Sequence, residues 1–172
     1  RRVLFRSFFG YLIIPFYYHG QLRYYNARKV IGNGPRYNNP NKDITGLGKE
    51  FIIFNYDALE MYRSVFICEG ALNALTLGDR GIATMGKAIS AYQVNELLKS
   101  SCQRYIILLD PDAKRYAVNL ALKLVAYKKV KVVFLPDGKD VNDLGRKQTL
   151  KLVYQTRYQS YQELVQIKNS LE

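Results

Sequence analysis

The sequence predicts an α/β fold, with a parallel sheet of about four strands flanked by helices and a smaller, basic, β-rich α+β subdomain before it. Short runs rich in Val and Ile alternate with helical segments in the second half of the chain, which is the pattern of βαβ units. Three of these runs end in acidic residues, namely Glu69, Asp110 and the cluster from Asp137 to Asp143. Ligands bind at the carboxyl ends of strands in open parallel sheets, so this edge is the predicted functional site.

Residues 1–62 form the predicted basic subdomain. It should begin with two strands joined by a turn at His19-Gly20, followed by a loop rich in Gly, Pro and Asn. A short strand and a short helix follow, with Asn55 in the capping position of that helix. The expected segments are two strands within residues 10–28, the loop at 31–43, the strand at 51–54 and the helix at 56–62.

Residues 63–148 form the predicted sheet domain, and residues 149–172 form a helical tail. Gly78 should end the first helix of the sheet domain, and Ser90 should cap the second. Gly145 should interrupt the last helix, and one amphipathic helix is expected in the tail from Thr149 to Ser170. The expected strands are 65–68, 81–84, 105–109 and 130–134, and the expected helices are 71–77, 90–100 and 113–128.

The composition favours a polyanionic partner. The net charge is +12, with 26 Lys and Arg against 14 Asp and Glu, and such an excess favours phosphate-bearing ligands. There are 15 Tyr residues, and tyrosine can stack on unpaired bases. Cys68, Cys102 and one His cannot complete a four-ligand zinc site, so no zinc is expected in this fragment.

Other features of the sequence bear on where in the cell the protein is located. The two cysteines are interpreted as reduced packing residues of a cytoplasmic protein. No apolar run reaches about 18 residues, so neither a membrane span nor a membrane partner is expected. The chain begins with Arg1-Arg2 rather than Met, and it is interpreted as a piece of a longer polypeptide.

Carboxylates that gather at one sheet edge repel one another unless a cation lies between them, and Mg²⁺ is the usual hard cation in such a place. The pattern therefore predicts a metal-dependent phosphoryl-transfer site. Each acid alone also has a structural interpretation. Glu69 is compatible with a helix-terminal acid favoured by the helix dipole, and Asp110-Pro111-Asp112 is compatible with a turn.

The order of these motifs resembles the TOPRIM domain of bacterial and phage DNA primases, type IA and type II topoisomerases and some nucleases. The resemblance runs from Arg63 to about Gly145. Several segments point to the bacterial or bacteriophage DnaG-type primase catalytic core. These segments are Val65-Phe-Ile-Cys-Glu-Gly70, Gly81-Ile-Ala-Thr-Met-Gly86, Leu135-Pro-Asp-Gly-Lys-Asp140-Val-Asn-Asp143, and Pro35-Arg-Tyr-Asn-Asn-Pro40 in the basic subdomain.

The resemblance implies a DNA-directed RNA polymerase of the primase type, a nucleotidyltransferase of DNA replication that needs Mg²⁺ or Mn²⁺. Its implied partners are single-stranded DNA template, NTPs, primer RNA and a replicative helicase. Glu69, Asp110 and Asp112 would be catalytic, and Glu69 would bind metal or act as general base on the attacking 3′-hydroxyl. The implied metal ligands are Glu69, Asp110, Asp112, Asp140 and Asp143, and the implied nucleic-acid or nucleotide contacts are Arg28, Arg36, Tyr37, Asn38 and Lys87.

The sequence departs from the primase pattern at three places. Asn73 stands where primases commonly have Asp, Pro111 separates the two middle acids where primases have Gly, and the last cluster reads Asp140-Val-Asn-Asp143. These changes suggest a divergent, phage-like primase with altered binding of a second metal. Two alternatives stay open: a TOPRIM nuclease or topoisomerase fragment, and a catalytically weakened nucleic-acid-binding module.

Overall fold

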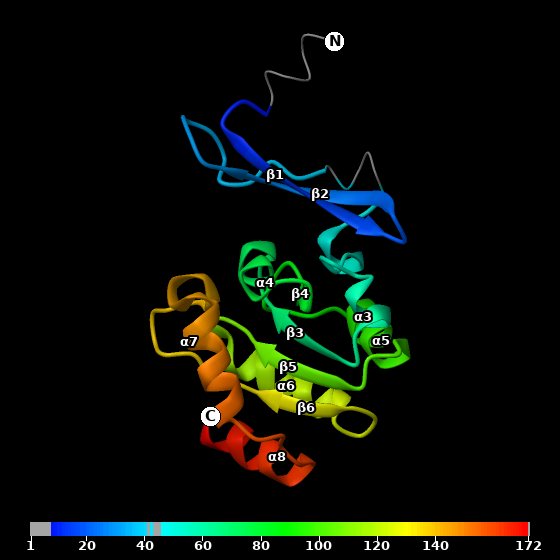
Figure 1. Cartoon of the computed structure of the whole chain (residues 1–172), viewed down its shortest axis with the longest axis vertical. Helices are drawn as coiled ribbons and strands as arrows, with labels where there is room; N and C mark the ends of the chain where they lie inside the picture. The colour runs from blue at the N-terminus through cyan, green and yellow to red at the C-terminus, as the bar shows by residue number, and fades with distance from the viewer. Residues whose placement is uncertain (1–7, 41, 43–45, 172) are drawn as a thin grey trace.

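The computed structural model describes residues 8–40, 42 and 46–171 (Figure 1). Residues 41 and 43, which belong to the loop expected over residues 31–43, lie outside the described residues. Arg1-Arg2 lies outside them as well.

A four-stranded parallel sheet forms the centre of the molecule, in the order β4-β3-β5-β6. The parallel sheet predicted from the sequence is confirmed, with strand ends within one or two residues of those expected. The strands are β3 (Ser64–Cys68), β4 (Gly81–Ala83), β5 (Arg104–Leu108) and β6 (Lys129–Val132).

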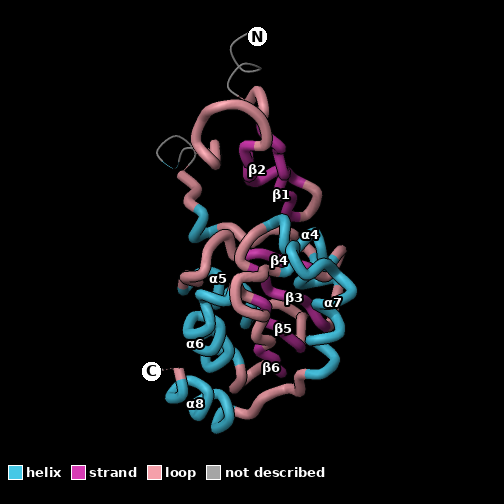
Figure 2. Tube along the Cα trace, turned by 90° about the vertical axis from the view of Figure 1, so that its left-hand side faces the viewer, coloured by secondary structure: helices cyan, strands magenta, loops and turns pink. Residues whose placement is uncertain are grey.

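Helices cover both faces of this sheet (Figure 2). One face packs against α4 (Ala71–Leu77) and α7 (Val141–Gln155), and the other against α5 (Ala91–Lys99), α6 (Lys114–Leu124) and α8 (Tyr161–Ser170). Alternate residues of each strand point to opposite faces, so the buried strand residues divide between two cores. In β5, Tyr105 and Ile107 belong to the core under α5 and α6, whereas Ile106 and Leu108 belong to the core under α4.

An antiparallel hairpin, β1 (Tyr11–Tyr18) and β2 (Gln21–Lys29), lies above the α4 side of the sheet (Figure 1). Its two-residue turn has positive φ at His19 (51°) and at Gly20 (75°), as the turns that suit the twist of a hairpin require. The expected turn is therefore confirmed. Ile14, Phe16 and Tyr24 join the core under α4, and this burial fixes the hairpin against the sheet domain.

The connection between hairpin and sheet differs from the prediction. The prediction of a strand at 51–54 is wrong. Phe51 ends the 3₁₀ turn η1 (Lys49–Phe51), and Phe54 forms only an isolated bridge with Ala83. The helix expected at 56–62 is the shorter α3 (Ala58–Met61).

Asn55 does not cap α3. It has a positive φ of 55°, and its side chain donates to the carbonyls of Asp79 and Gly81, each at 2.9 Å. Asp57 occupies the capping position but uses its carboxylate elsewhere, because it accepts the backbone N–H of His19 at 2.8 and 3.0 Å. These contacts tie the hairpin turn and the edge strand β4 to the connection.

The carboxyl-terminal half follows the prediction except at its helix ends. Gly78 and Ser90 act as expected, and Gly145 interrupts α7 at φ 71°. The helix expected at 113–128 is a 3₁₀ turn, η2 (Pro111–Ala113), followed by α6. The prediction of a single tail helix is wrong, because α7 runs on to Gln155 and α8 starts only after Ser160.

The limits of the three expected domains stay a prediction. No helix within the described ranges is both long and apolar enough to span a membrane.

Candidate active site

Two carboxylates meet at the carboxyl edge of the sheet. Glu69 follows β3 and Asp110 follows the adjacent β5, and both side chains are half-buried. Burial raises the pKa of Glu69, and the charges of Asp110 and Asp112 raise it further. Burial also raises the pKa of Asp110, with further contributions from Asp140, Asp112 and Asp143. The negative charges of the neighbouring acids therefore act on Glu69 and Asp110, the two that follow adjacent strands.

An amide supports this cluster from α4. Asn73 is only 6% exposed, and its Nδ2 donates to Oδ1 of Asp110 at 3.2 Å. A hydrogen bond to the charged form of a carboxylate stabilises that form. The residue that departs from the primase pattern therefore contributes a donor to Asp110 in place of another negative charge.

Asp112 is held by a different partner. Its Oδ2 accepts a hydrogen bond from Lys87 Nζ at 2.8 Å, and its side chain is 69% exposed. This contact lowers the pKa of Asp112 and raises that of Lys87. An exposed ion pair of this kind contributes little to the stability of the fold, so an incoming ligand can separate it cheaply.

Asp140 and Asp143 form the amino-terminal cap of α7. Oδ1 of Asp140 accepts the backbone N–H of Asp143 at 2.8 Å, and Oδ2 of Asp143 accepts the backbone N–H of Asp140 at 3.0 Å. Reciprocal capping of this type fixes the first turn of a helix. Each carboxylate keeps a second oxygen for other contacts.

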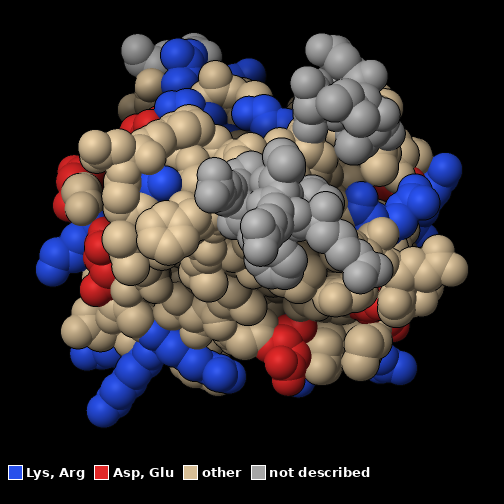
Figure 3. All heavy atoms as spheres, turned by 90° about the horizontal axis from the view of Figure 1, so that it is seen from above, with Lys and Arg blue, Asp and Glu red and all other residues tan. Residues whose placement is uncertain are grey.

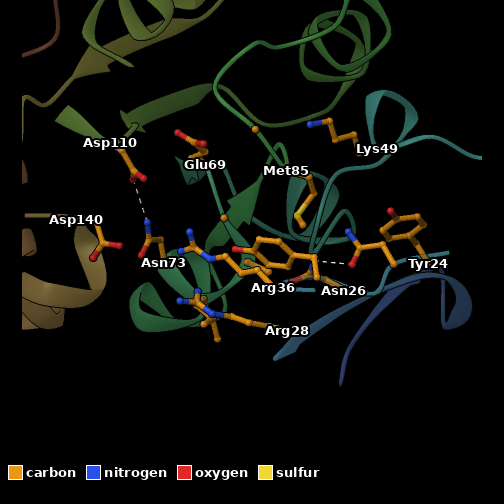
Figure 4. A pocket seen from close by; sticks show the side chains of 16 residues that line it. Tyr24, Asn26, Arg28, Arg36, Lys49, Glu69, Asn73, Met85, Asp110 and Asp140 are labelled. Atoms are coloured by element: carbon orange, nitrogen blue, oxygen red, sulfur yellow. Dashed lines mark hydrogen bonds between the residues drawn. The ribbon is translucent and has the colours of Figure 1, made fainter. Parts of the chain in front are cut away.

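A cavity of about 460 Å³, here named the central cavity, joins the acids to the basic subdomain. Figure 4 shows the labelled Arg28 and Arg36 on the hairpin side, with Glu69, Asp110 and Asp140 along the sheet edge. The lining from the hairpin and the loop after it is Tyr24, Asn26, Arg28, Arg36, Tyr37 and Asn39, and the sheet edge contributes Glu69, Asn73, Asp110 and Asp140. A second cavity, the side cavity, lies against Asp110, Asp112, Asp137, Asp140 and Asp143.

The loop after β2 is folded back along that strand, and this brings its basic residues to the central cavity. The backbone N–H of Lys29 donates to the carbonyl of Arg36 at 3.0 Å. Oδ1 of Asn39 accepts hydrogen bonds from Asn26 Nδ2 at 2.9 Å and from the backbone of Ala27 at 3.2 Å. The guanidinium of Arg36 lies 5.6 Å from the ring centre of Tyr37. Seen from above the hairpin, Lys and Arg side chains project around much of the rim of the molecule, with Asp and Glu side chains among them (Figure 3).

Comparison with known proteins agrees with this geometry. Residues 66–145 match the model of the family described as Toprim-like. The chain is 28% identical over 149 residues to a DNA primase of Aquifex aeolicus (strain VF5), which covers 78% of this chain and 30% of that protein. Residues 66–145 therefore have a TOPRIM fold similar to that of DnaG-type primases.

Solved primase structures share the fold. The zinc-binding and RNA polymerase domains of the Aquifex aeolicus primase superpose with a TM-score of 0.71 at 23% identity, over 89% of this chain and 42% of that one. The E. coli primase catalytic core gives a TM-score of 0.72 at 21% identity, over 94% of this chain and 56% of that one. The chain thus spans about a third of the curated relative and about half of these solved chains.

The TOPRIM carboxylates suit a divalent cation without forming a finished site. Among the described residues, no three His, Cys, Asp or Glu side chains are arranged to hold a metal ion. Glu69 and Asp110 are nevertheless half-buried acids with raised pKa values, and a hard cation bound by their oxygens would relieve that repulsion. The donor set fits Mg²⁺ or Mn²⁺, and the assignment of individual ligands stays a prediction.

Some of the residues that line the central cavity were predicted from the sequence, and others were not. Arg28, Arg36 and Tyr37 line it, but the neighbouring asparagine that lines it is Asn39, whereas Asn38 donates its backbone N–H to the carbonyl of Ala27 at 2.9 Å. Lys87 is held at Asp112, outside this lining. The residues missed were Tyr24, Asn26, Asn39, Lys49 and Met85. Alternation along β2 could have indicated Tyr24 and Asn26, since they share a face with Arg28.

Proposed function

We propose that this chain is the RNA-polymerase core of a DNA primase and that it synthesises short RNA primers on single-stranded DNA from NTPs. One observation carries the proposal: a single cavity has arginines on one wall and paired carboxylates on the other. Nucleotidyl transfer needs both, because phosphates must be bound and a hydroxyl must be activated close to them. Action in the cytoplasm with a replicative helicase belongs to the same proposal.

The chain's own residues divide the work. Arg28 and Arg36 would bind phosphates of the template or the incoming nucleotide, since a guanidinium can make two parallel hydrogen bonds to one phosphate. Tyr37 would stack on a base. Lys87 would leave Asp112 to meet a phosphate as a point charge, at small cost because the pair is exposed.

Glu69 and Asp110 would hold Mg²⁺ or Mn²⁺ through carboxylate oxygens, with Asp112, Asp140 and Asp143 around the side cavity as further ligands. When bound, the ion would activate the 3′-hydroxyl and neutralise charge on the triphosphate. Glu69 would alternatively act as general base on the attacking 3′-hydroxyl.

The variant Asp110→Asn tests this proposal. It keeps the side-chain shape and an acceptor for Asn73 but removes the charge, so primer synthesis should fall by at least about 100-fold. The assay is incorporation of labelled NTP into dinucleotide on a single-stranded template with Mg²⁺ or Mn²⁺. Asp79→Asn, which alters an exposed acid before β4, should retain activity. Full activity in a folded Asp110→Asn protein would refute the assigned site.

A non-catalytic nucleic-acid-binding module is the second candidate. It is favoured by Asn73 in the position of an expected acid, by the pairing of Asp112 with Lys87, and by the lack of a preformed metal cluster among the described residues. Calorimetry separates the two. DNA binding without uptake of Mg²⁺ or Mn²⁺ would favour the module. Template cleavage in the synthesis reactions would instead favour a TOPRIM nuclease.

A further inference from the structure

A basic groove lies at the amino edge of the sheet, opposite the carboxylates. Its volume is about 500 Å³, and it is lined by Gln103, Arg104, Val125, Tyr127, Lys128 and Lys129, which define the amino-edge groove. In Figure 1 the connection from α6 to β6, which supplies Val125, Tyr127 and Lys128 to the groove, lies at the other end of the strands from the start of α7. None of its lining residues is acidic.

Two like charges stand side by side in this groove. Arg104 begins β5 and Lys129 begins β6, and the two residues are directly paired in the parallel register. Like charges opposite each other on neighbouring strands destabilise a sheet. Both residues are exposed, and within the described part of the chain neither forms an ion pair. The repulsion between Arg104 and Lys129 lowers the stability of the fold, and a bound anion would restore that stability.

A third cation is fixed in place beside them. Lys128 Nζ donates to the carbonyls of Ser100 at 2.7 Å and of Cys102 at 2.8 Å. These contacts orient the ammonium group but leave its charge uncompensated by any acid in the groove lining. The backbone N–H of Lys129 donates to the carbonyl of Gln103 at 3.0 Å, so the floor of the groove is tied to both strands.

An aromatic ring completes the groove. Tyr127 lies in the connection between α6 and β6 and is 78% exposed. Three cations select for phosphate or carboxylate, whereas an exposed ring beside them adds a surface for a base. A flexible single strand can offer both phosphates and an unpaired base, which favours it over an acidic peptide or a free anion.

We propose that the amino-edge groove binds single-stranded nucleic acid, with phosphates at Arg104 and Lys129 and a base on Tyr127. This contact is separate from the central cavity. The five residues of β5 that divide the two edges span about 17 Å at roughly 3.4 Å per residue. A strand bound at both edges must therefore bridge about this distance along the molecule.

The double variant R104A/K129A tests the groove directly. Affinity for fluorescein-labelled dT₂₄ is measured by anisotropy across salt concentrations in EDTA. The slope of log K against log[salt] should become shallower by about 1.4, from two phosphate contacts at about 0.7 each. Tyr127→Ala should weaken dT₂₄ binding by at least about fivefold without changing the slope.

The control K123A/K147A removes the same charge from exposed positions on α6 and α7 and should leave the slope unchanged. If R104A/K129A behaves like this control, the groove is not a binding site. If polyglutamate of equal charge displaces dT₂₄ from the groove as well as unlabelled dT₂₄ does, the assignment to nucleic acid is wrong. Neither readout needs metal or synthesis, so both are independent of the catalytic proposal.

Discussion

The amide of Asn73 shows how one residue sets the electrostatics of the carboxylates. It donates to Asp110 at 3.2 Å from a buried position on α4. A carboxylate in the same place would add negative charge next to an acid whose pKa is already raised. The chain thus has fewer charges for a cation to balance, and affinity for hard cations rises with the charge of the ligands.

Asn73→Asp should therefore bind Mn²⁺ more tightly, by at least about tenfold, or roughly 1.4 kcal/mol. It should also raise the pKa of Asp110 in the metal-free protein, because two carboxylates would then face each other. Titration followed by electron paramagnetic resonance gives the Mn²⁺ affinity, and carbon-detected NMR gives the pKa. Asn73→Ala, which removes the donor without adding charge, should not tighten Mn²⁺ binding. Equal affinities in all three proteins would contradict this account.

The sequence predicted the acids of the site better than the residues that face them. Glu69 and Asp110 follow apolar strands, and strand order alone places such ends at one edge. Asn39 reaches the central cavity only because its side chain binds Asn26 and the backbone of Ala27. Lys49 reaches it from the 3₁₀ turn η1. Both positions depend on contacts between distant segments, which local sequence patterns do not encode.

At the scale of elements, a buried amide on α5 holds the connection between hairpin and sheet. Nε2 of Gln93 donates to the carbonyls of Ile52 at 2.7 Å, Thr84 at 2.8 Å and Lys49 at 3.2 Å. The backbone carbonyl of Glu50 accepts from Ser90 Oγ at 2.6 Å. These bonds satisfy carbonyls that no strand reaches, and they place Lys49 at the central cavity.

Gln93→Leu should destabilise the protein by about 2–6 kcal/mol, because two buried carbonyls lose their donor and each costs about 1–3 kcal/mol unsatisfied. Urea denaturation followed by circular dichroism measures the loss. Gln148→Leu, at an exposed position of α7, should change the stability by less than about 0.5 kcal/mol. A Gln93→Leu protein as stable as the Gln148→Leu control would show that water or rearrangement satisfies the carbonyls.

The elements that the sequence misplaced were decided by tertiary partners. The apolar run at 51–54 looks like a strand, but β4 has only three residues and offers Phe54 a single bridge. The tail helix breaks where Gln159 pairs with the exposed edge of β6. Its backbone N–H donates to Val130 at 3.1 Å, and its side-chain oxygen accepts from the N–H of Val132 at 2.8 Å. Covering an edge strand in this way outweighs continuing a helix.

At the scale of the whole molecule, charge is divided along the strands. Acids gather at the carboxyl edge, arginines of the hairpin face them across the central cavity, and the amino edge is basic. The net charge of +12 is therefore not uniform around the sheet. The positive surface would attract a nucleic-acid strand over a wide area. At the carboxylates the electrostatic potential would be lower, so that the approach of phosphates there would be favourable only with a bound cation.

The hairpin arginines should then contribute to template binding independently of metal. R28A/R36A should weaken binding of dT₈ and dT₂₄ alike, with the salt slope shallower by about 1.4 in both. Anisotropy in EDTA and in Mg²⁺ measures this loss of affinity. In EDTA, Asp110→Asn should bind DNA at least as well as the unmodified chain does, since the variant removes a negative charge. Loss confined to Mg²⁺ would mean that the arginines contact only the metal-bound nucleotide. Loss in both conditions, added to the loss that R104A/K129A causes for dT₂₄, would place one strand across both ends of the sheet.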